Sequence, residues 1–226
     1  MNWTRSDIAA LILCLFATPP AQAGTMTVLG SSGGSFSVKV TSIKESRFQS
    51  VVKQQYDFSC GSAALATLLT YHYQSPVSEQ EVFKAMFDIG DQKKIRAQGF
   101  SLLDMKNYLV AHGFKAAGYQ ASLDKLAAIG VPAIVLINMR GYKHFVVVKG
   151  VTEKDVLLGD PAAGTRSMPR AEFESSWNGL LFLVLSKKDV GKNHFNLAQD
   201  WDFRERAPLG AAMSNARLAN VGLLFP

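Results

Sequence analysis

Apolar residues recur at helical spacing in several segments of the front half of the chain. One segment begins near Cys60, is apolar on all sides and contains no proline, which predicts a largely buried helix. The next opens with Ser78, and Glu81 follows three residues later, a capping-box pattern ahead of an apolar stripe. Two further helices are predicted over 101–113 and 122–130, each ending at a glycine.

The pattern changes after residue 130, where short apolar runs rich in β-branched residues follow one another. Such runs between turn residues predict strands. The predicted strands are 35–43, 131–139, 144–151, 155–160 and 180–186, and a brief helical turn is predicted at 169–177. Helices first and strands second, with no long linker, predict a single α+β domain. In this fold a helical N-terminal half packs on an antiparallel sheet from the C-terminal half.

The first residues have the parts of a secretory signal peptide. Arg5 precedes an unbroken apolar run from Ile8 to Ala17, and the small-x-small sequence Ala21-Gln22-Ala23 follows. This order is typical of an exported chain, and the run is too short to span a bilayer as a stable helix. We therefore expect cleavage after Ala23 and a periplasmic protein. The alternative is that the run forms a buried helix of the fold.

Shifts in composition divide the rest of the chain. After the signal peptide at 1–23, a flexible lead-in rich in Gly, Ser and Thr and then a strand occupy 24–50. Residues 51–186 contain the predicted helices and strands of the domain. The tail, 187–226, is more polar and less periodic, and its RLANVGLL stretch predicts a short amphipathic helix.

Composition narrows the classes of function. Apolar residues make up 48% of the 226 residues and charged residues 19%, as in a globular protein with its own core. Two cysteines exclude a disulfide scaffold and a four-cysteine zinc site. The net charge of +6 comes from scattered Lys and Arg, which does not indicate nucleic-acid binding.

Other classes have no support in the pattern. No second long apolar run follows the first, so no stable membrane span is expected in the mature protein. Zinc-protease, phosphate-loop and dinucleotide motifs are absent from the sequence. We therefore expect no metal and no cofactor.

Removal of Cys14 with the signal peptide would leave Cys60 as the single thiol. At the start of a helix, free backbone N–H groups and the helix dipole stabilise a thiolate. Gly61 permits close approach of a substrate backbone. The amide of Gln54, six residues upstream, can donate a hydrogen bond to an oxyanion alongside the Cys60 N–H. The alternative is that Cys60 is a small buried apolar residue.

His144 opens one predicted strand, and Asp160 ends the next. Neighbouring strands joined by a tight turn can bring these ends side by side, so that Asp160 orients the imidazole while His144 takes the thiol proton. The alternatives are an ordinary strand-end histidine and an Asp-Pro turn. The remaining histidines are placed less favourably, late in the Cys60 helix, in a last helical turn and in the tail: His72, His112 and His194.

These residues together resemble a known family. Their order, Gln54, Cys60-Gly61, His144-Phe145-Val146-Val147 and Asp160-Pro161, is similar to that of the double-glycine leader peptidases, papain-like cysteine peptidases of bacteriocin exporters. The resemblance spans about Val51 to Leu185. It implies a papain-like fold, with Cys60 as nucleophile, His144 as base, Asp160 as orienting acid and Gln54 in the oxyanion hole. Gln55 is the adjacent alternative, but the family's glutamine stands six residues before the cysteine.

The stretches QQYDFSCGSAALATLL, GFSLLDMK and HFVVV resemble more closely the stand-alone members encoded with functional amyloid (Fap) secretion systems. The resemblance implies a periplasmic cysteine peptidase that processes functional amyloid components or supports their export. Its expected partners are protein or peptide substrates, among them amyloid subunits or their export machinery. Ser59 departs from the exporter domains, which commonly have Asp directly before the cysteine.

Two other functions are compatible with the same residues. One is a catalytically idle, chaperone-like or binding module of the amyloid secretion system. The other is acyl transfer or amide hydrolysis on a non-protein substrate. The substrate, the scissile bond, self-processing and the oligomeric state are left open by the sequence.

Overall fold

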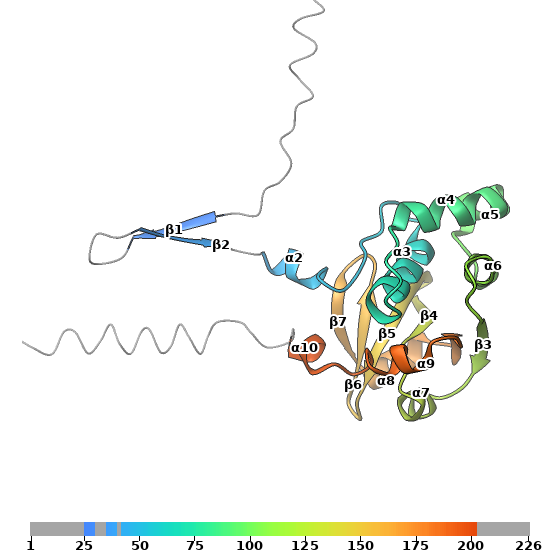
Figure 1. Ribbon diagram of the computed structural model, residues 1–226. Coiled ribbons are helices and arrows are strands. Elements are labelled where there is room, and N and C mark those ends of the chain that lie inside the picture. The colour runs from blue at the N-terminus through green and yellow to red at the C-terminus, as the bar shows by residue number, and fades with distance from the viewer. Residues whose placement is uncertain (1–24, 30–34, 40–41, 203–226) are drawn as a thin grey trace, which may run out of the picture. The chain divides into compact units, whose positions relative to one another are not determined.

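The computed structural model describes residues 25–29, 35–39 and 42–202, and the chain divides into two compact units, Met1–Ile43 and Lys44–Pro226 (Figure 1). In the first unit, strands β1 (Thr25–Leu29) and β2 (Ser35–Lys39) pair antiparallel. β2 lies within a predicted strand. β1 was not predicted, because the Gly/Ser/Thr-rich composition around it masks the extended preference of Thr and Val. The predicted signal peptide and the RLANVGLL helix lie outside the described residues.

The second unit is α+β, as predicted. Its strands form one antiparallel sheet of six strands in the order β3-β8-β4-β5-β6-β7. The strands are β3 (Ala116–Gln120), β4 (Ala133–Met139), β5 (Tyr142–Val151), β6 (Asp155–Asp160), β7 (Gly164–Pro169) and β8 (Leu180–Val184). The helices are α2 (Ile43–Arg47), α3 (Cys60–Thr67), the π-helix η2 (Leu68–His72), α4 (Glu79–Ile89), α5 (Gln92–Gln98), α6 (Leu102–Ala111), α7 (Leu123–Ile129), α8 (Arg170–Ser176), α9 (Lys188–Lys192) and α10 (Ala198–Trp201).

Local chemistry explains where the predicted helices begin. The Ser78 hydroxyl accepts a hydrogen bond from the Glu81 N–H, and the Glu81 carboxylate accepts one from the Ser78 N–H, which completes the predicted capping box of α4. Ser101 and Asp104 form the same arrangement at the start of α6. Gly130 ends α7 in the left-handed conformation, which glycine adopts without a steric penalty.

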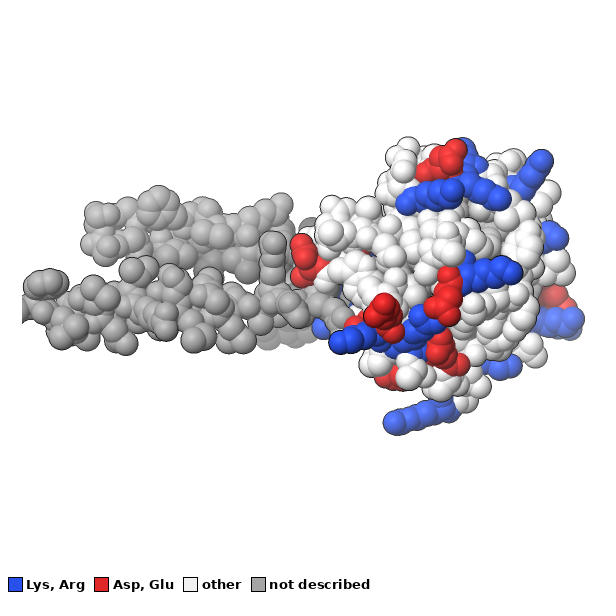
Figure 2. All heavy atoms as spheres, turned by 90° about the horizontal axis from the view of Figure 1, so that it is seen from below, with Lys and Arg blue, Asp and Glu red and all other residues white. Residues whose placement is uncertain are grey.

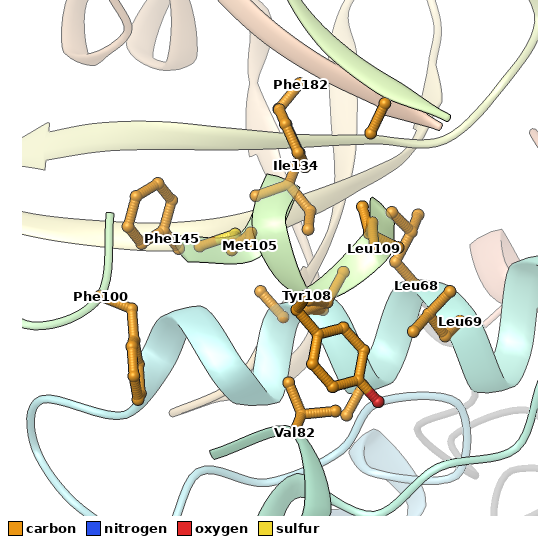
Figure 3. Close-up of a cluster of buried hydrophobic side chains, with 14 of the residues drawn as sticks. Leu68, Leu69, Val82, Phe100, Met105, Tyr108, Leu109, Ile134, Phe145 and Phe182 are labelled. Atoms are coloured by element: carbon orange, nitrogen blue, oxygen red, sulfur yellow. The ribbon is translucent and has the colours of Figure 1, made fainter. Parts of the chain in front are cut away.

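Helices pack on both faces of the sheet. One face packs against α3, α4 and α6, and Figure 3 shows Ile134, Phe145 and Phe182 of the sheet gathered with the helical residues Leu68, Met105 and Leu109. The opposite face packs against α7 and α8, with Leu126 and Phe173 among its buried residues. Because β4 and β5 are covered on both faces, they consist of the continuous apolar runs seen in the sequence.

Besides β1 and the short helices α2, α9 and α10, the sequence analysis missed α5, β7 and β3. α5 buries one residue, Ile95, so it carries no apolar stripe. β7 contains a glycine and ends at Pro169, and β3 is short, with its last three residues exposed. β3 comes before residue 130, where the sequence analysis began the strands, and it joins the sheet beside β8.

The predicted tail begins with two helices, α9 and α10, that pack on the second unit. The α10 carboxylate of Asp200 lies 3.0 Å from the ammonium of Lys149 on β5. Among the described residues, no helix is long and apolar enough to cross a membrane.

Candidate active site

Cys60 is buried and is the first residue of α3, as the sequence predicted. Ala63 is the first residue whose N–H enters the helical ladder, donating to the Ser59 carbonyl at 3.1 Å. The N–H groups of Cys60, Gly61 and Ser62 therefore have no partner within the helix. A negative charge at the Cys60 sulfur, or on an oxygen beside it, would lie at the positive end of this helix.

His144 and Asp160 meet where β5 and β6 run side by side. His144 Nε2 lies 2.8 Å from Asp160 Oδ1, and both side chains are buried. β5 and β6 are paired antiparallel, which brings the start of one beside the end of the other. The pairing expected from the hairpin is therefore present in the structure.

This pair holds its members in their charged forms. Burial by itself would lower the pKa of His144, but the hydrogen bond to Asp160, the neighbouring Cys60 side chain and the charges of both outweigh it and raise the pKa to about 9. Burial would likewise raise the pKa of Asp160, yet the His144 hydrogen bond and charge, the Ala162 N–H and Arg166 lower the pKa to about 2. At neutral pH the pair is an imidazolium beside a carboxylate.

The second ring nitrogen of His144 is the one left for Cys60. An ionised carboxylate can only accept, so Nε2 carries the proton that bonds to Asp160. Nδ1 has no partner at good hydrogen-bond geometry among the described residues. Its interaction with the thiol is looser than a formed hydrogen bond, as is common in free enzymes. The Tyr142 ring stacks over the imidazole, with ring centroids 5.7 Å apart.

Arg166 supports Asp160 and was not predicted. Its Nε donates to Asp160 Oδ2 at 2.9 Å, and the Ala162 N–H donates to Oδ1 at the same distance. Arg166 is on β7, which pairs with β6, and only that pairing brings it beside Asp160. Because β7 was not recognised in the sequence, no signal pointed to this arginine.

Gln54 lies close to the pair but its amide is not directed at Cys60. Its backbone N–H donates to the Pro161 carbonyl at 3.0 Å, which places Gln54 beside the strand end that carries Asp160. Its side-chain Nε2 donates to the Tyr56 carbonyl at 3.0 Å. Gln55, the sequence alternative, is exposed.

A buried polar network lies beneath the start of α3. The Ser59 hydroxyl accepts from the Tyr56 N–H and donates to the Tyr56 carbonyl. The Ser62 hydroxyl lies 2.9 Å from the Ser59 carbonyl and 3.0 Å from Oε1 of Glu79. Glu79 is only 3% exposed although it is a carboxylic acid. This network fixes the position of the residue directly before Cys60, and nothing in the linear sequence signalled it.

Cys60 borders a cleft of about 950 Å³. One wall is the connection from α5 to α6, and the other is the turn from β4 into β5. Apolar side chains line both walls, and Arg96 and Lys143 add positive charge. The lining residues are Asp57, Phe58, Cys60, Arg96, Ala97, Gln98, Gly99, Phe100, Ser101, Leu102, Leu103, Leu136, Gly141, Tyr142, Lys143 and Phe145. A cleft of this size can hold an extended peptide across the thiol.

The other histidines do not join the pair. His72 is buried, its Nδ1 lies 3.0 Å from the His194 carbonyl, and burial lowers its pKa to about 4. Nδ1 of His112 lies 2.8 Å from the Tyr108 carbonyl within its own helix. Within the described part of the chain, no group of three or more His, Cys, Asp or Glu side chains could hold a metal ion.

A thiol at a helix start, facing a buried histidine–carboxylate pair on a sheet, defines the papain-like class of cysteine peptidases. Residues 49–189 match the Peptidase C39 family, and the chain belongs to this family. The crystal structure of the peptidase domain of Streptococcus ComA superposes with a TM-score of 0.51, at 24% sequence identity, over 60% of this chain and 96% of that domain. The predicted papain-like fold and cysteine-peptidase class are thereby confirmed.

Two curated relatives are more similar in sequence. A protein of Pseudomonas fluorescens described as "Probable functional amyloid protease FapD" is 44% identical over 180 residues, which are 79% of this chain and 80% of the relative. A protein of Pseudomonas aeruginosa with the same description is 42% identical over 184 residues, covering 81% and 80%. The predicted likeness to amyloid-associated members of the family is therefore confirmed.

Proposed function

We propose that this protein is a periplasmic cysteine peptidase that processes functional amyloid components or supports their export, with Cys60, His144, Asp160 and Gln54 as its catalytic residues. The observation that carries the proposal is the buried pair of His144 and Asp160, 2.8 Å apart, beside a thiol at a helix start that borders a cleft. The descriptions of the two Pseudomonas relatives support the amyloid substrate class. The signal-peptide pattern at residues 1–23 supports export.

The reaction starts from an imidazolium at His144, which holds on Nδ1 the proton given up by the Cys60 thiol. Asp160 stabilises this imidazolium through Nε2. The thiolate then attacks the carbonyl carbon of the peptide bond. A carbon–sulfur bond forms while the carbonyl π-electrons move to the oxygen.

The developing oxyanion would lie against the first turn of α3. The Cys60 N–H has no partner within the helix and can donate to that oxygen. Gln54 would supply a second donor after its amide leaves the Tyr56 carbonyl. His144 then gives its proton to the departing amine, and water hydrolyses the thioester with His144 as the base, which regenerates the free thiol.

Alkylation of the purified chain from residue 24 onward by iodoacetamide tests the activated thiol. Wild type should label much faster than urea-unfolded protein, and Cys60→Ala should not label at all. His144→Ala should slow labelling, since the base is lost, whereas His112→Ala, on a histidine outside the site, should label as wild type. Equal labelling of folded and unfolded wild type would overturn the proposed nucleophile.

A second experiment tests substrate and location. Amyloid components co-expressed with wild type should show a new terminus by mass spectrometry that is missing with Cys60→Ala. If amyloid export is unchanged by Cys60→Ala, the chaperone-like alternative is correct and the peptidase role fails. Periplasmic extracts should contain a chain beginning at Gly24, and a chain that retains Met1 in the cytosol would contradict export.

A further inference from the structure

β3 lies at one margin of the sheet and pairs only with β8 (Figure 1). The Lys115 carbonyl accepts from Leu185, and the Ala121 N–H donates to Gly179, so the backbones of these two residues point towards β8. In an antiparallel pair, successive residues alternate between pointing to the partner strand and away from it. The N–H and C=O groups of Ala116, Gly118 and Gln120 therefore point outward.

This edge lacks the usual protection. Within the described chain no hydrogen bond reaches those outward backbone groups, and residues 118–120 are exposed. Exposed sheet edges are normally blunted by charge, proline or a covering segment. The opposite edge has all three, because β7 carries Arg166, ends at Pro169 and has Arg47 packed against Gly164 too closely for a Cβ. β3, with sequence AAGYQ, has neither charge nor proline.

An apolar hollow of about 260 Å³ lies beside this edge. It is formed where α7 leaves part of the β3–β8 surface uncovered, with Leu181 and Leu183 on its floor. Tyr119 and Ile129 stand at the hollow with 45% and 38% of their surface exposed. A strand added to β3 would place every second side chain on the same side of the sheet as this hollow.

The hollow also has a positive rim. Lys125 and Lys188 line it, and neither forms an ion pair among the described residues. The neighbouring carboxylate Asp124 is occupied by Arg170 at 2.8 Å, and Asp189 does not line the hollow. On the face of the molecule seen in Figure 2, Lys and Arg lie among Asp and Glu.

The positive charge of Lys125 and Lys188 distinguishes between possible occupants of the β3 edge. Two copies of this chain joined edge to edge would bring their lysines together, and like charges at an interface are unfavourable. An extended segment would fit all three features. Its backbone would pair with the outward groups of β3, its alternate apolar residues would enter the hollow, and carboxylates at its ends would meet the lysine rim.

We propose that the β3 edge is a docking site that binds such an acidic, apolar segment of the protein substrate by strand addition, separate from the cleft at Cys60. The identity of the occupant as substrate rests on the proposed peptidase function. Docking at β3 would hold an unfolded substrate while another part of it enters the cleft, which raises the effective concentration of the scissile bond.

The test measures binding without cleavage. The Cys60→Ala protein is titrated into a fluorescein-labelled peptide of about seven residues, with valine at alternate positions and glutamate at both ends. Fluorescence anisotropy reports binding. A peptide with lysine in place of each glutamate is the charge control and should bind roughly tenfold more weakly.

Two variants probe the edge and the rim. Gly118→Pro, made in the Cys60→Ala protein, removes an outward N–H without breaking the β3–β8 ladder and should weaken binding at least roughly tenfold. Lys125→Glu with Lys188→Glu should reverse the preference between the peptides. Lys93→Glu with Lys154→Glu makes the same charge change away from the hollow and should not. Thermal melting confirms that each variant is folded.

Binding that is absent, or that survives Gly118→Pro in a folded protein, overturns the docking site. A dimer of the Cys60→Ala protein that Gly118→Pro disperses in sedimentation would also overturn it, because a second copy would then occupy the edge. If iodoacetamide labelling of wild-type Cys60 fails while the glutamate peptide still binds at β3, the peptidase role fails and the docking site stands.

Discussion

His144 and Asp160 link the chemistry of the site to the stability of the fold. The pKa of His144 is about 9 in the folded protein against an ordinary value of 6.5, so its contribution is fully present below pH 6.5 and is lost as the pH rises through 9. The pKa of Asp160 is about 2 against 3.8, so its contribution is present above pH 3.8 and is lost as the pH falls through 2.

We therefore predict that wild type loses stability relative to His144→Gln as the pH rises from about 6.5 to about 9.5. The shift in the pKa of His144 corresponds to a loss on the order of 3 kcal/mol. Urea unfolding followed by circular dichroism at several pH values measures it. Parallel stability curves for the two proteins across this range would contradict the paired imidazolium.

Arg166 gives a second prediction, about the orientation of Asp160. Arg166→Gln removes a charge-assisted hydrogen bond to Oδ2, so Asp160 should hold the imidazole less firmly. We expect kcat/KM to fall roughly tenfold, mainly through kcat, with partial recovery in Arg166→Lys. Peptide hydrolysis across a pH series measures this, and the low-pH limb should move upward because the pKa of Asp160 rises. An unchanged profile would assign Arg166 a structural role alone.

At the residue scale, the sequence predicted contacts between residues that are close along the chain and missed contacts between distant segments. His144 and Asp160 belong to consecutive strands of one hairpin, so their contact follows from local pairing. Arg166 needed the unpredicted β7, and Glu79 reaches Ser62 only through helix packing. For Gln54 the direction of the side-chain amide is set by its hydrogen bond to the Tyr56 carbonyl, which the sequence does not reveal.

The junction of α3 with α6 limits the residue after the nucleophile. A Cβ on Gly61 would lie 2.9 Å from Met105 Cε and 3.0 Å from Phe100 Cβ. Gly61→Ala should therefore push α3 from α6 and cost about 1–2 kcal/mol in the free energy of unfolding. Because Cys60 moves with the helix start, iodoacetamide labelling of the thiol should slow as well.

The matched control is another glycine. At Gly118 a Cβ would meet Leu180 Cδ1 at 3.4 Å, an ordinary contact, so Gly118→Ala should change stability and labelling little. Urea unfolding and labelling of both variants make the comparison. Equal effects of the two substitutions would show that packing between α3 and α6 is not the cause.

Elements were predictable where their stabilising signal lies within their own residues. The starts of α4 and α6 are recognisable in the sequence from Ser78 and Ser101, because each side chain accepts a hydrogen bond from the backbone of the same turn. β3 and β7 are held in the sheet by backbone hydrogen bonds to β8 and β6. Backbone hydrogen bonds leave no pattern of apolar side chains in the sequence of either strand. This is why apolar periodicity found the central strands and missed both edges of the sheet.

At the scale of the whole molecule, a buried lysine joins the two ends of the catalytic unit. Lys149 of β5 has a side chain that is 0% exposed, with its Nζ 3.0 Å from Asp200 Oδ1 and 2.6 Å from Ser50 Oγ. Burial lowers the pKa of Lys149, and the Asp200 carboxylate opposes that shift. Lys149 therefore connects Ser50, which precedes Cys60, with Asp200. Asp200 lies beyond the family match, which ends at residue 189.

Asp200→Asn should destabilise the unit by about 3 kcal/mol, because it leaves a buried ammonium without its counter-charge. Lys149→Met combined with Asp200→Asn should recover most of that loss, since an apolar side chain then fills the site. Urea unfolding of the single and double variants measures both effects. A double variant no more stable than Asp200→Asn would show that charge is not the reason.

The sequence by itself determined the α+β class, the papain-like fold and the cysteine-peptidase class. Helix caps, apolar runs and a cysteine at a helix start are patterns of a few neighbouring residues, so they can be recognised in the sequence. Only the tertiary structure decided that Arg166 and Glu79 support the site, that Lys149 joins both ends of the unit and that β3 remains an open edge. These features depend on which distant segments share a surface, and strand pairing and burial determine that only once the chain has folded.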